Sequence, residues 1–129
     1  MQDMNILVVF CSRTGRTEKL ALAAALGAVQ ARANIRLRWL REDADDSMIQ
    51  GVPEWRENRD RMEKEYIAPR AVDAEWADAI LIGASGAPPE LKGYLVSLGG
   101  KVETAFIDPE NARLRGRQVT EAARAKKQG

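Results

Sequence analysis

Residues 5–17 read NILVVFCSRTGRT, and this stretch decides the fold. Its first part, Asn5–Phe10, is a continuous apolar run, which is typical of a central strand buried on both faces of a parallel sheet. Its second part, Cys11–Thr17, is polar and contains a glycine, which predicts a loop. From about Gly15 to Ala33 the pattern becomes helical. The sequence therefore predicts a strand, a loop and a helix in direct succession.

The helix predicted after this loop has two features. Alanines are enriched in it, which raises helix propensity and permits close packing on a sheet. Its larger apolar residues fall at positions i, i+3, i+4 and i+7, and they are Leu22, Ala25, Leu26 and Val29.

Strands and helices continue to alternate along the rest of the chain. Strand patterns cover Ile35–Leu40, Ala79–Gly83 and Lys101–Ile107, and helix patterns cover Pro53–Tyr66, Pro88–Leu98 and a final segment from Asp108-Pro109 to about Lys127. In Ile35–Leu40 apolar residues alternate with Arg36 and Arg38, which predicts an edge strand with one exposed face. Glu42–Gly51 is acidic and is expected to be a loop. This order predicts one α/β domain over residues 1–129, with helices on both faces of a parallel sheet.

Composition excludes several classes of function. The 129 residues carry a net charge of +1, so nothing favours nucleic acid or an anionic membrane as a partner. Histidine is absent, which excludes histidine-based metal sites and Ser-His-Asp triads. The single cysteine, Cys11, fits a reducing, cytoplasmic setting. No apolar run approaches the roughly 20 residues that span a bilayer. We expect the tryptophans to pack in the core and the basic end of the chain to be a solvated helix terminus.

The loop after the first strand carries the chemistry of an anion site. Its residues are Ser12, Arg13, Thr14, Gly15, Arg16 and Thr17. A helix N-terminus presents unpaired backbone N–H groups and a positive partial charge, and the hydroxyls and arginines here would add donors and charge. An ordinary N-cap and turn is the alternative, but three hydroxyl residues, a glycine and two arginines in six positions favour a phosphate site. Neither a G-x-x-x-x-G-K-[ST] nor a G-x-G-x-x-G motif is present.

The S-x-T-G-x-T pattern of Ser12–Thr17 resembles the FMN-phosphate loop of flavodoxins and of the related NAD(P)H:quinone oxidoreductases of the tryptophan-repressor-binding-protein type. Three further segments are similar to those reductases in the same order along the chain, namely Trp76–Gly83, Leu91–Leu95 and Gly116–Lys127. The resemblance implies a flavodoxin-like three-layer αβα sandwich, with FMN at the carboxyl ends of the strands. It also implies that Ser12–Thr17 hold the phosphate and that Ala84, Ser85, Gly86 and Ala87 lie near the flavin ring.

The sequence departs from this family in its second half. The loop Ala84–Pro88 has no aromatic residue to stack on the flavin ring. Only Ile107–Pro109 separates the fourth predicted strand from the last helix, so the fifth strand of a flavodoxin is expected to be missing. The sheet would have four strands in the order 2-1-3-4, with the fourth strand at an edge. An apolar edge favours pairing with another chain, which predicts a homodimer.

Cys11 supports a rival hypothesis. Low-molecular-weight tyrosine phosphatases and arsenate reductases place a C-x5-R-[ST] loop after the first strand and use a late Asp-Pro as general acid. This chain has Cys11, Arg16, Thr17 and Asp108-Pro109, but its spacing is C-x4-R, one residue short. A small buried residue at the end of a strand is the simpler interpretation of Cys11.

The leading hypothesis from the sequence is an FMN-binding NAD(P)H-dependent quinone or flavin oxidoreductase, or an electron carrier. NAD(P)H would be the electron donor, and a small molecule the acceptor. The first alternative is a shortened, non-catalytic binding or assembly module that keeps the anion pocket. The second is the phosphatase-like enzyme that uses Cys11.

Overall fold

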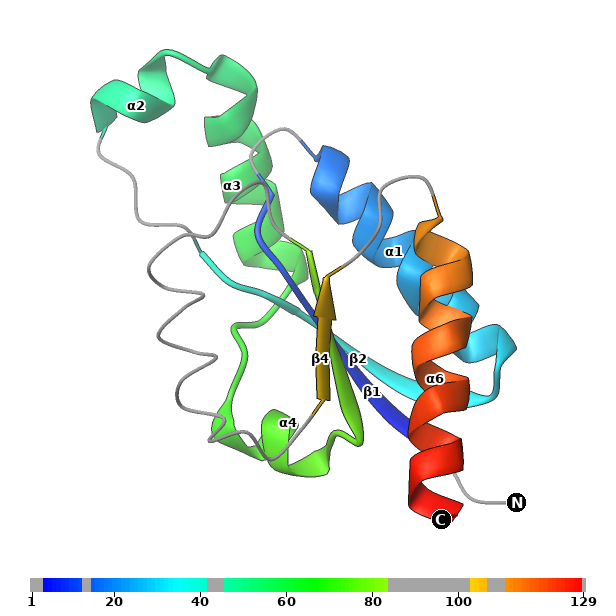
Figure 1. Ribbon diagram of the computed structural model, residues 1–129. Helices are drawn as coiled ribbons and strands as arrows, with labels where there is room; N and C mark the ends of the chain where they lie inside the picture. The colour runs from blue at the N-terminus through cyan, green and yellow to red at the C-terminus, as the bar shows by residue number, and fades with distance from the viewer. Residues whose placement is uncertain (1–3, 13–14, 42–45, 84–102, 107–110, 129) are drawn as a thin grey trace.

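The computed structural model describes residues 4–12, 15–41, 46–83, 103–106 and 111–128 (Figure 1). Along the chain the elements are β1 (Met4–Phe10), α1 (Arg16–Gln30), β2 (Ala33–Trp39), α2 (Asp46–Gln50), α3 (Pro53–Glu65), α4 (Ala71–Trp76), β3 (Ala79–Gly83), β4 (Glu103–Phe106) and α6 (Ala112–Gln128). The predicted strands and the helices near Gly15–Ala33, at Pro53–Tyr66 and at the end of the chain are confirmed within a few residues. The predicted loop Ala84–Ala87, the helix Pro88–Leu98 and Asp108-Pro109 lie outside the described residues.

The four strands form one parallel sheet in the order β2-β1-β3-β4, as predicted. Strand β1 is central, and it pairs with β2 from Met4↔Ala33 to Phe10↔Trp39. On its other side β1 pairs with β3 from Ile6↔Ala79 to Phe10↔Gly83. The chain therefore leaves β1 toward β2 on one side and returns through β3 on the other. This reversal of direction creates a topological switch point between β1 and β3.

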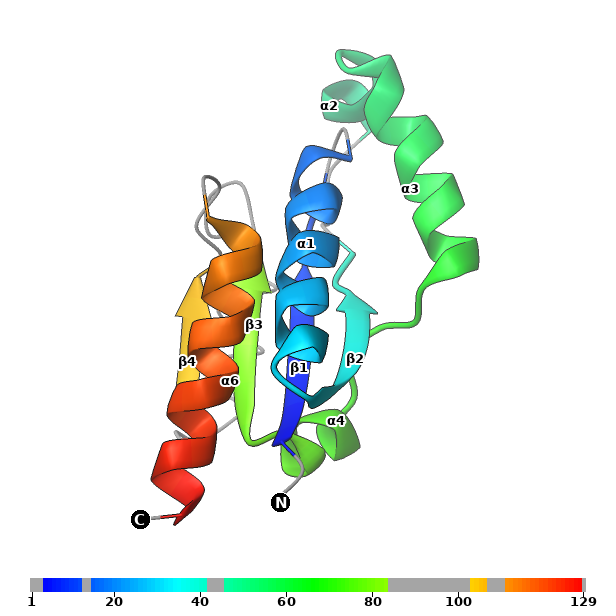
Figure 2. The ribbon, with the colours of Figure 1, turned by 90° about the vertical axis from the view of Figure 1, so that its right-hand side faces the viewer.

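Side chains of β1 alternate between two apolar cores, one on each face of the sheet. The first core contains Met4, Ile6, Val8 and Phe10 together with residues of α1, α3 and α6. The second contains Leu7 and Val9 together with Ile80 and Ile82 of β3 and residues of α4. Figures 1 and 2 show α1 and α6 side by side on one face and α4 by the other. The fold is thus a flavodoxin-like α/β sandwich with buried strand residues on both faces, which explains the unbroken apolar run in the sequence.

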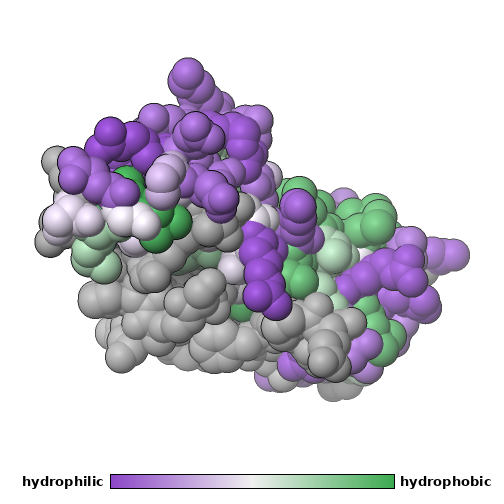
Figure 3. Space-filling view, turned by 90° about the horizontal axis from the view of Figure 1, so that it is seen from above, coloured by the Kyte–Doolittle hydropathy of each residue, from purple (hydrophilic) through white to green (hydrophobic). Residues whose placement is uncertain are grey.

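Helices α1 and α6 approach each other closely at two glycines. A Cβ on Gly27 would lie 1.8 Å from the carbonyl oxygen of Arg113, and one on Gly116 would lie 1.9 Å from that of Ala24. The alanines of α1 are buried in the core, as expected for close packing. The larger residues of the predicted apolar stripe are instead exposed: Leu22 by 44%, Leu26 by 50% and Val29 by 48%. Figure 3 shows hydrophobic atoms at the surface on this side of the molecule and a hydrophilic cap over α2 and α3.

The predicted exposed polar face of the second strand is wrong, because its arginines are covered by α4. Arg36 and Arg38 of β2 point toward α4 and bind Asp73, whose side chain is fully buried. Arg38 contacts both carboxylate oxygens, and Arg36 contacts one of them at 3.1 Å. The backbone N–H of Arg70 also donates to this carboxylate, at 2.9 Å. A short helix that the sequence pattern did not indicate therefore covers these arginines.

Two further expectations are revised. The acidic segment Glu42–Gly51 contains the short helix α2 rather than only a loop. The basic end of the chain is not simply solvated, because Arg124 donates to the carbonyl oxygen of Ala31 at 2.6 Å and Lys127 lies 3.3 Å from Asp78. Trp39 and Trp55 are buried, which confirms their predicted place in the core. Trp76 is partly exposed, with the Arg36 guanidinium 4.3 Å from its ring centre.

In the part of the chain that the structure describes, no helix combines the length and apolar character needed to cross a membrane. Within the same residues, no group of three or more histidine, cysteine, aspartate or glutamate side chains is arranged to hold a metal ion.

Candidate functional site

The two loops singled out from the sequence begin next to each other at the carboxyl edge of the sheet. Phe10, at the end of β1, is the register partner of Gly83, at the end of β3. One residue further on, the backbone N–H of Cys11 donates to the carbonyl oxygen of Gly83 at 2.9 Å. This edge is the switch point between β1 and β3, where open α/β sheets bind their ligands. The topology thus brings the ends of β1 and β3 together immediately before the two predicted loops.

Ser12 organises the connection from β1 to α1. Its Oγ accepts a hydrogen bond from the backbone N–H of Gly15 at 3.1 Å and a second one from that of Glu18 at 3.3 Å. Gly15 has a φ of +92°, in the left-handed region that favours glycine. The glycine in the predicted loop is therefore required by backbone conformation, and the serine caps the helix.

The other predicted residues of this loop divide into two groups. Thr17 is buried in the first turn of α1, and Arg16 is exposed at the same end. Arg13 and Thr14 lie outside the described residues, as do Ala84, Ser85, Gly86 and Ala87.

The donors at this helix start suit an anion. Helix α1 has 15 residues, long enough for a positive partial charge at its N-terminus. The hydroxyl of Ser12 accepts hydrogen bonds from the backbone, and a hydroxyl can also donate one. Thr17 supplies a second hydroxyl and Arg16 a guanidinium. These side chains are of the kind that binds a phosphate, whereas the backbone N–H groups of Gly15 and Glu18 already donate to Ser12.

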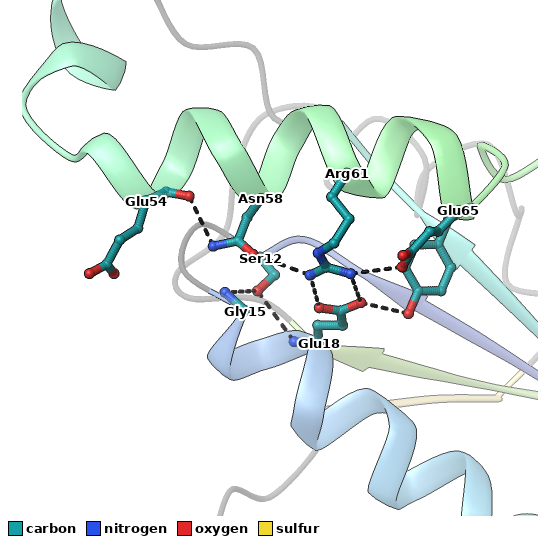
Figure 4. A network of polar contacts seen from close by, with 8 residues as sticks. Ser12, Gly15, Glu18, Glu54, Asn58, Arg61 and Glu65 are labelled. Carbon is teal, nitrogen blue, oxygen red and sulfur yellow. Dashed lines mark hydrogen bonds and ion pairs between the residues drawn. The ribbon is translucent and has the colours of Figure 1, made fainter.

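A second polar network lies directly beside the loop (Figure 4). Glu18, in the first turn of α1, has a side chain only 9% exposed, and its carboxylate forms a two-point ion pair with Arg61 of α3. The hydroxyl of Tyr66 donates to the same carboxylate at 2.6 Å. The Arg61 hydrogen bond holds the pKa of Glu18 below its usual value, whereas burial and the bond to Glu18 raise the pKa of Tyr66. The carboxylate is therefore anionic and fully engaged.

Helix α3 covers the start of α1 through this network. Arg61 also contacts Glu65 at 2.7 Å and the side-chain oxygen of Asn58 at 3.2 Å. That Asn58 oxygen would lie 3.6 Å from a Cβ on Gly15. Met62 of the same helix is completely buried in the core that contains Phe10. Helix α3 is therefore attached to the loop region by both apolar and charged contacts.

Sequence reasoning missed the roles of Glu18, Asn58 and Arg61. The sequence predicted a helix over Pro53–Tyr66 but assigned none of its side chains to the site. Asn58 follows Trp55 by three positions and precedes Arg61 by three, so the two polar residues lie along one edge of the face that carries the buried Trp55. That spacing was the signal that could have drawn them to the site.

Cys11 is only 4% exposed at the end of β1. This burial agrees with the simpler interpretation of Cys11 as a packing residue, and it gives a phosphate ester little access to the sulfur. Asp108, the general acid of the phosphatase hypothesis, lies outside the described residues.

The strand order and the position of the loop define a flavodoxin-like α/β protein. No family model matches the chain. The chain is similar to an NAD(P)H dehydrogenase (quinone) from Deinococcus radiodurans, with 32% identity over 101 residues. The match covers 75% of this chain and 50% of the relative, so the chain spans about half the length of the curated protein that it matches. This similarity agrees with the family resemblance of the sequence motifs.

Proposed function

We propose that this chain binds FMN at the β1–β3 switch point and serves as an NAD(P)H-dependent quinone or flavin oxidoreductase, or as an electron carrier. One observation carries the proposal: the N–H of Cys11 bonds to the carbonyl of Gly83, so the hydroxyl-rich loop and the loop after β3 start side by side. The name of the similar protein, NAD(P)H dehydrogenase (quinone), supports the same class of chemistry.

The phosphate is assigned to Ser12, Arg13, Thr14, Gly15, Arg16 and Thr17. Ser12 and Thr17 would donate hydroxyl hydrogens, and Arg16 would add positive charge at the start of α1. Ala84–Ala87 are assigned to the ring, which they would contact without aromatic stacking. When bound, FMN would supply hydride acceptance and electron transfer, while the protein supplies binding and orientation.

Comparison of FMN with riboflavin tests this assignment, because the two differ only in the phosphate. Flavin fluorescence is titrated with the protein at low ionic strength. If the loop holds the phosphate, FMN binds at least about tenfold more tightly than riboflavin, since charge-assisted hydrogen bonds to a phosphate are worth about 1.5–3 kcal/mol. Equal affinity for the two flavins, or no uptake of either, would refute the proposed FMN site.

Two variants sharpen the test. Arg16 and Lys19 are both exposed cations near the start of α1, but only Arg16 belongs to the proposed phosphate loop. We expect Arg16→Ala to weaken FMN about tenfold and to leave riboflavin unchanged. Lys19→Ala serves as the matched control and is expected to change FMN affinity by less than about threefold, since exposed charges further away are screened. A larger loss in Lys19→Ala than in Arg16→Ala would contradict the assignment of Arg16.

A specific observation also favours a second candidate, the non-catalytic binding or assembly module. Ser12 already satisfies the N–H groups of Gly15 and Glu18, so two donors that a phosphate would use are taken by the protein itself. A module of this kind would stay colourless after incubation with excess FMN and still be folded by circular dichroism. The predicted dimer through β4 is a separate proposal, and light scattering of the purified protein would test it.

A further inference from the structure

We infer that Arg61 is a positioning residue for the anion site: it pairs with the Glu18 carboxylate and so lowers the negative charge that a dianion would meet at the start of α1. The inference rests on the proposed function, because it concerns the phosphate that Ser12–Thr17 would hold. It assigns a role in ligand binding to helix α3, which lies far from that loop in the sequence.

The first step is the location of Glu18. Its backbone N–H is capped by Ser12, so the residue shares the helix start with the loop. Its Oε1 would lie 3.9 Å from a Cβ on Gly15. A negative charge in the first turn gains from the helix dipole, but it also repels a second anion placed at the same terminus. Glu18 would therefore oppose phosphate binding if its charge were not compensated.

The negative charge of Glu18 is compensated by Arg61. The two terminal nitrogens of Arg61 reach the two carboxylate oxygens of Glu18, and Tyr66 donates to one of those oxygens. Arg61 also donates a hydrogen bond to Asn58 and forms an ion pair with Glu65, both on the same helix. These contacts fix the guanidinium in the plane of the carboxylate. Because Arg61 is shared with Glu65, the three groups carry a net charge of −1, but a phosphate in the loop would meet a Glu18 carboxylate that is paired with a guanidinium instead of an unpaired one.

The third step separates this role from a purely structural one. Arg61 also attaches α3 to α1, and loss of that attachment would disturb every ligand of the site. Charge compensation instead predicts an effect on only some ligands. It predicts that removal of Arg61 harms only ligands that carry a phosphate, and that removal of the Glu18 charge reverses the harm.

The experiment measures FMN and riboflavin binding by fluorescence for the full chain and four variants: Arg61→Gln, Glu18→Gln, the double variant, and Arg56→Gln as the control. Arg56 is an exposed arginine on the same helix, so its replacement changes the net charge equally. We expect Arg61→Gln to weaken FMN about tenfold or more, with riboflavin unchanged. Glu18→Gln is expected to bind FMN as tightly as the unchanged protein or more tightly. The FMN affinity of the double variant should return to within about threefold of that of the unchanged protein. The FMN affinity of Arg56→Gln should equal that of the unchanged protein.

Several results would overturn the inference. Equal weakening of FMN and riboflavin by Arg61→Gln, or no recovery in the double variant, would show that Arg61 acts through structure alone. If Arg61→Gln does not fold, the test rests on Glu18→Gln. Weaker FMN binding by Glu18→Gln than by the unchanged protein would also overturn the inference. A second readout is the rise in melting temperature that inorganic phosphate causes, which should be smaller in Arg61→Gln than in Arg56→Gln. Failure of the unchanged protein to prefer FMN over riboflavin would instead remove the proposed function itself.

Discussion

The carbonyl oxygen of Ala24 lies only 1.9 Å from the position that a Cβ on Gly116 would occupy. The two helix backbones are therefore in direct contact at this point, and the same is true where Gly27 meets Arg113. Both glycines lie inside helices, where glycine is normally unfavourable. Their contribution comes from the close approach that they permit, which lets α1 and α6 share one face of a narrow sheet.

Gly116→Ala is expected to destabilise the protein by about 3 kcal/mol, even though alanine is the better helix former by about 1 kcal/mol. A methyl group cannot fit against a carbonyl oxygen unless the helices separate. Urea denaturation measures the change in the free energy of unfolding. Gly51→Ala is the control, because its Cβ would meet the carbonyl oxygen of Met48 at an ordinary 3.5 Å. Equal stability of these two variants would contradict the close contact.

At Gly15 the constraint is the backbone and not the space around it. A Cβ there would meet Asn58 at 3.6 Å, an ordinary contact, but the φ of +92° is unfavourable for residues with a side chain. We expect Gly15→Ala to cost about 1–2 kcal/mol of stability and Gly15→Asn to cost less, since asparagine tolerates the left-handed region better. Thermal denaturation of both variants distinguishes them. If asparagine were the worse substitution, crowding and not φ would be the constraint.

The two faces of α1 should respond differently to substitution. Leu26 is half exposed, so Leu26→Gln is expected to change the free energy of unfolding by less than about 0.5 kcal/mol. Ala28 is completely buried, so Ala28→Leu is expected to destabilise by about 1–3 kcal/mol through overpacking. Chemical denaturation of the two variants provides the measurement. The opposite ranking would mean that α1 presents its leucine stripe, and not its alanines, to the sheet.

Asp73 should make stability depend on pH in the acid range. Burial works to raise its pKa, but hydrogen bonds from Arg38, Arg36 and the Arg70 backbone lower the pKa to about 2, below the ordinary 3.8. Because the folded-state pKa is depressed, the contribution of Asp73 is complete above the ordinary value and is lost as pH falls toward 2. The difference corresponds to about 2 kcal/mol, at about 1.4 kcal/mol per pKa unit.

The measurement for Asp73 is the free energy of unfolding from pH 7 to pH 2. Asp73→Asn is expected to be less stable at pH 7, and the gap to the unchanged protein should narrow below about pH 4. Asp60→Asn, at an exposed position of α3, is the control for the loss of one carboxylate. A gap that stays constant down to pH 2 would show that the charge of Asp73 does not contribute to folding.

Local patterns in the sequence predicted the strands well. The unbroken run of β1 and the short run of β3 predicted buried strands, and their alternation with helices predicted a parallel sheet; the β2-β1-β3-β4 order was implied by the resemblance to flavodoxins. The hydroxyl-rich loop was also found from its residues alone, and Ser12 and Gly15 occupy the helix start that the pattern implied. These features depend on residues that are close together in the chain, so a local sequence pattern is enough to predict them.

Other features depend on residues that are distant in the chain. The spacing of Leu22, Leu26 and Val29 predicted that α1 is a helix but not which face it buries. Gly27 and Gly116 bring α6 so close that the small-residue face of α1 is buried. The arginines of β2 were predicted to face water, but Asp73 lies 35 positions beyond Arg38 and forms a buried ion pair with it. Helix periodicity cannot anticipate such partners, because it describes one element at a time.

By itself, then, the sequence determined the identity of the strands, their alternation with helices, and the hydroxyl-rich start of α1, since hydrophobic periodicity and turn chemistry act over a few residues. Only the tertiary structure decided that Arg61 of α3 pairs with Glu18 beside that loop, 43 positions away in the chain. An ion pair at that separation forms because burial of Met62 in the core that contains Phe10 holds α3 in place. Packing of distant segments, and not local pattern, sets which charges face the site.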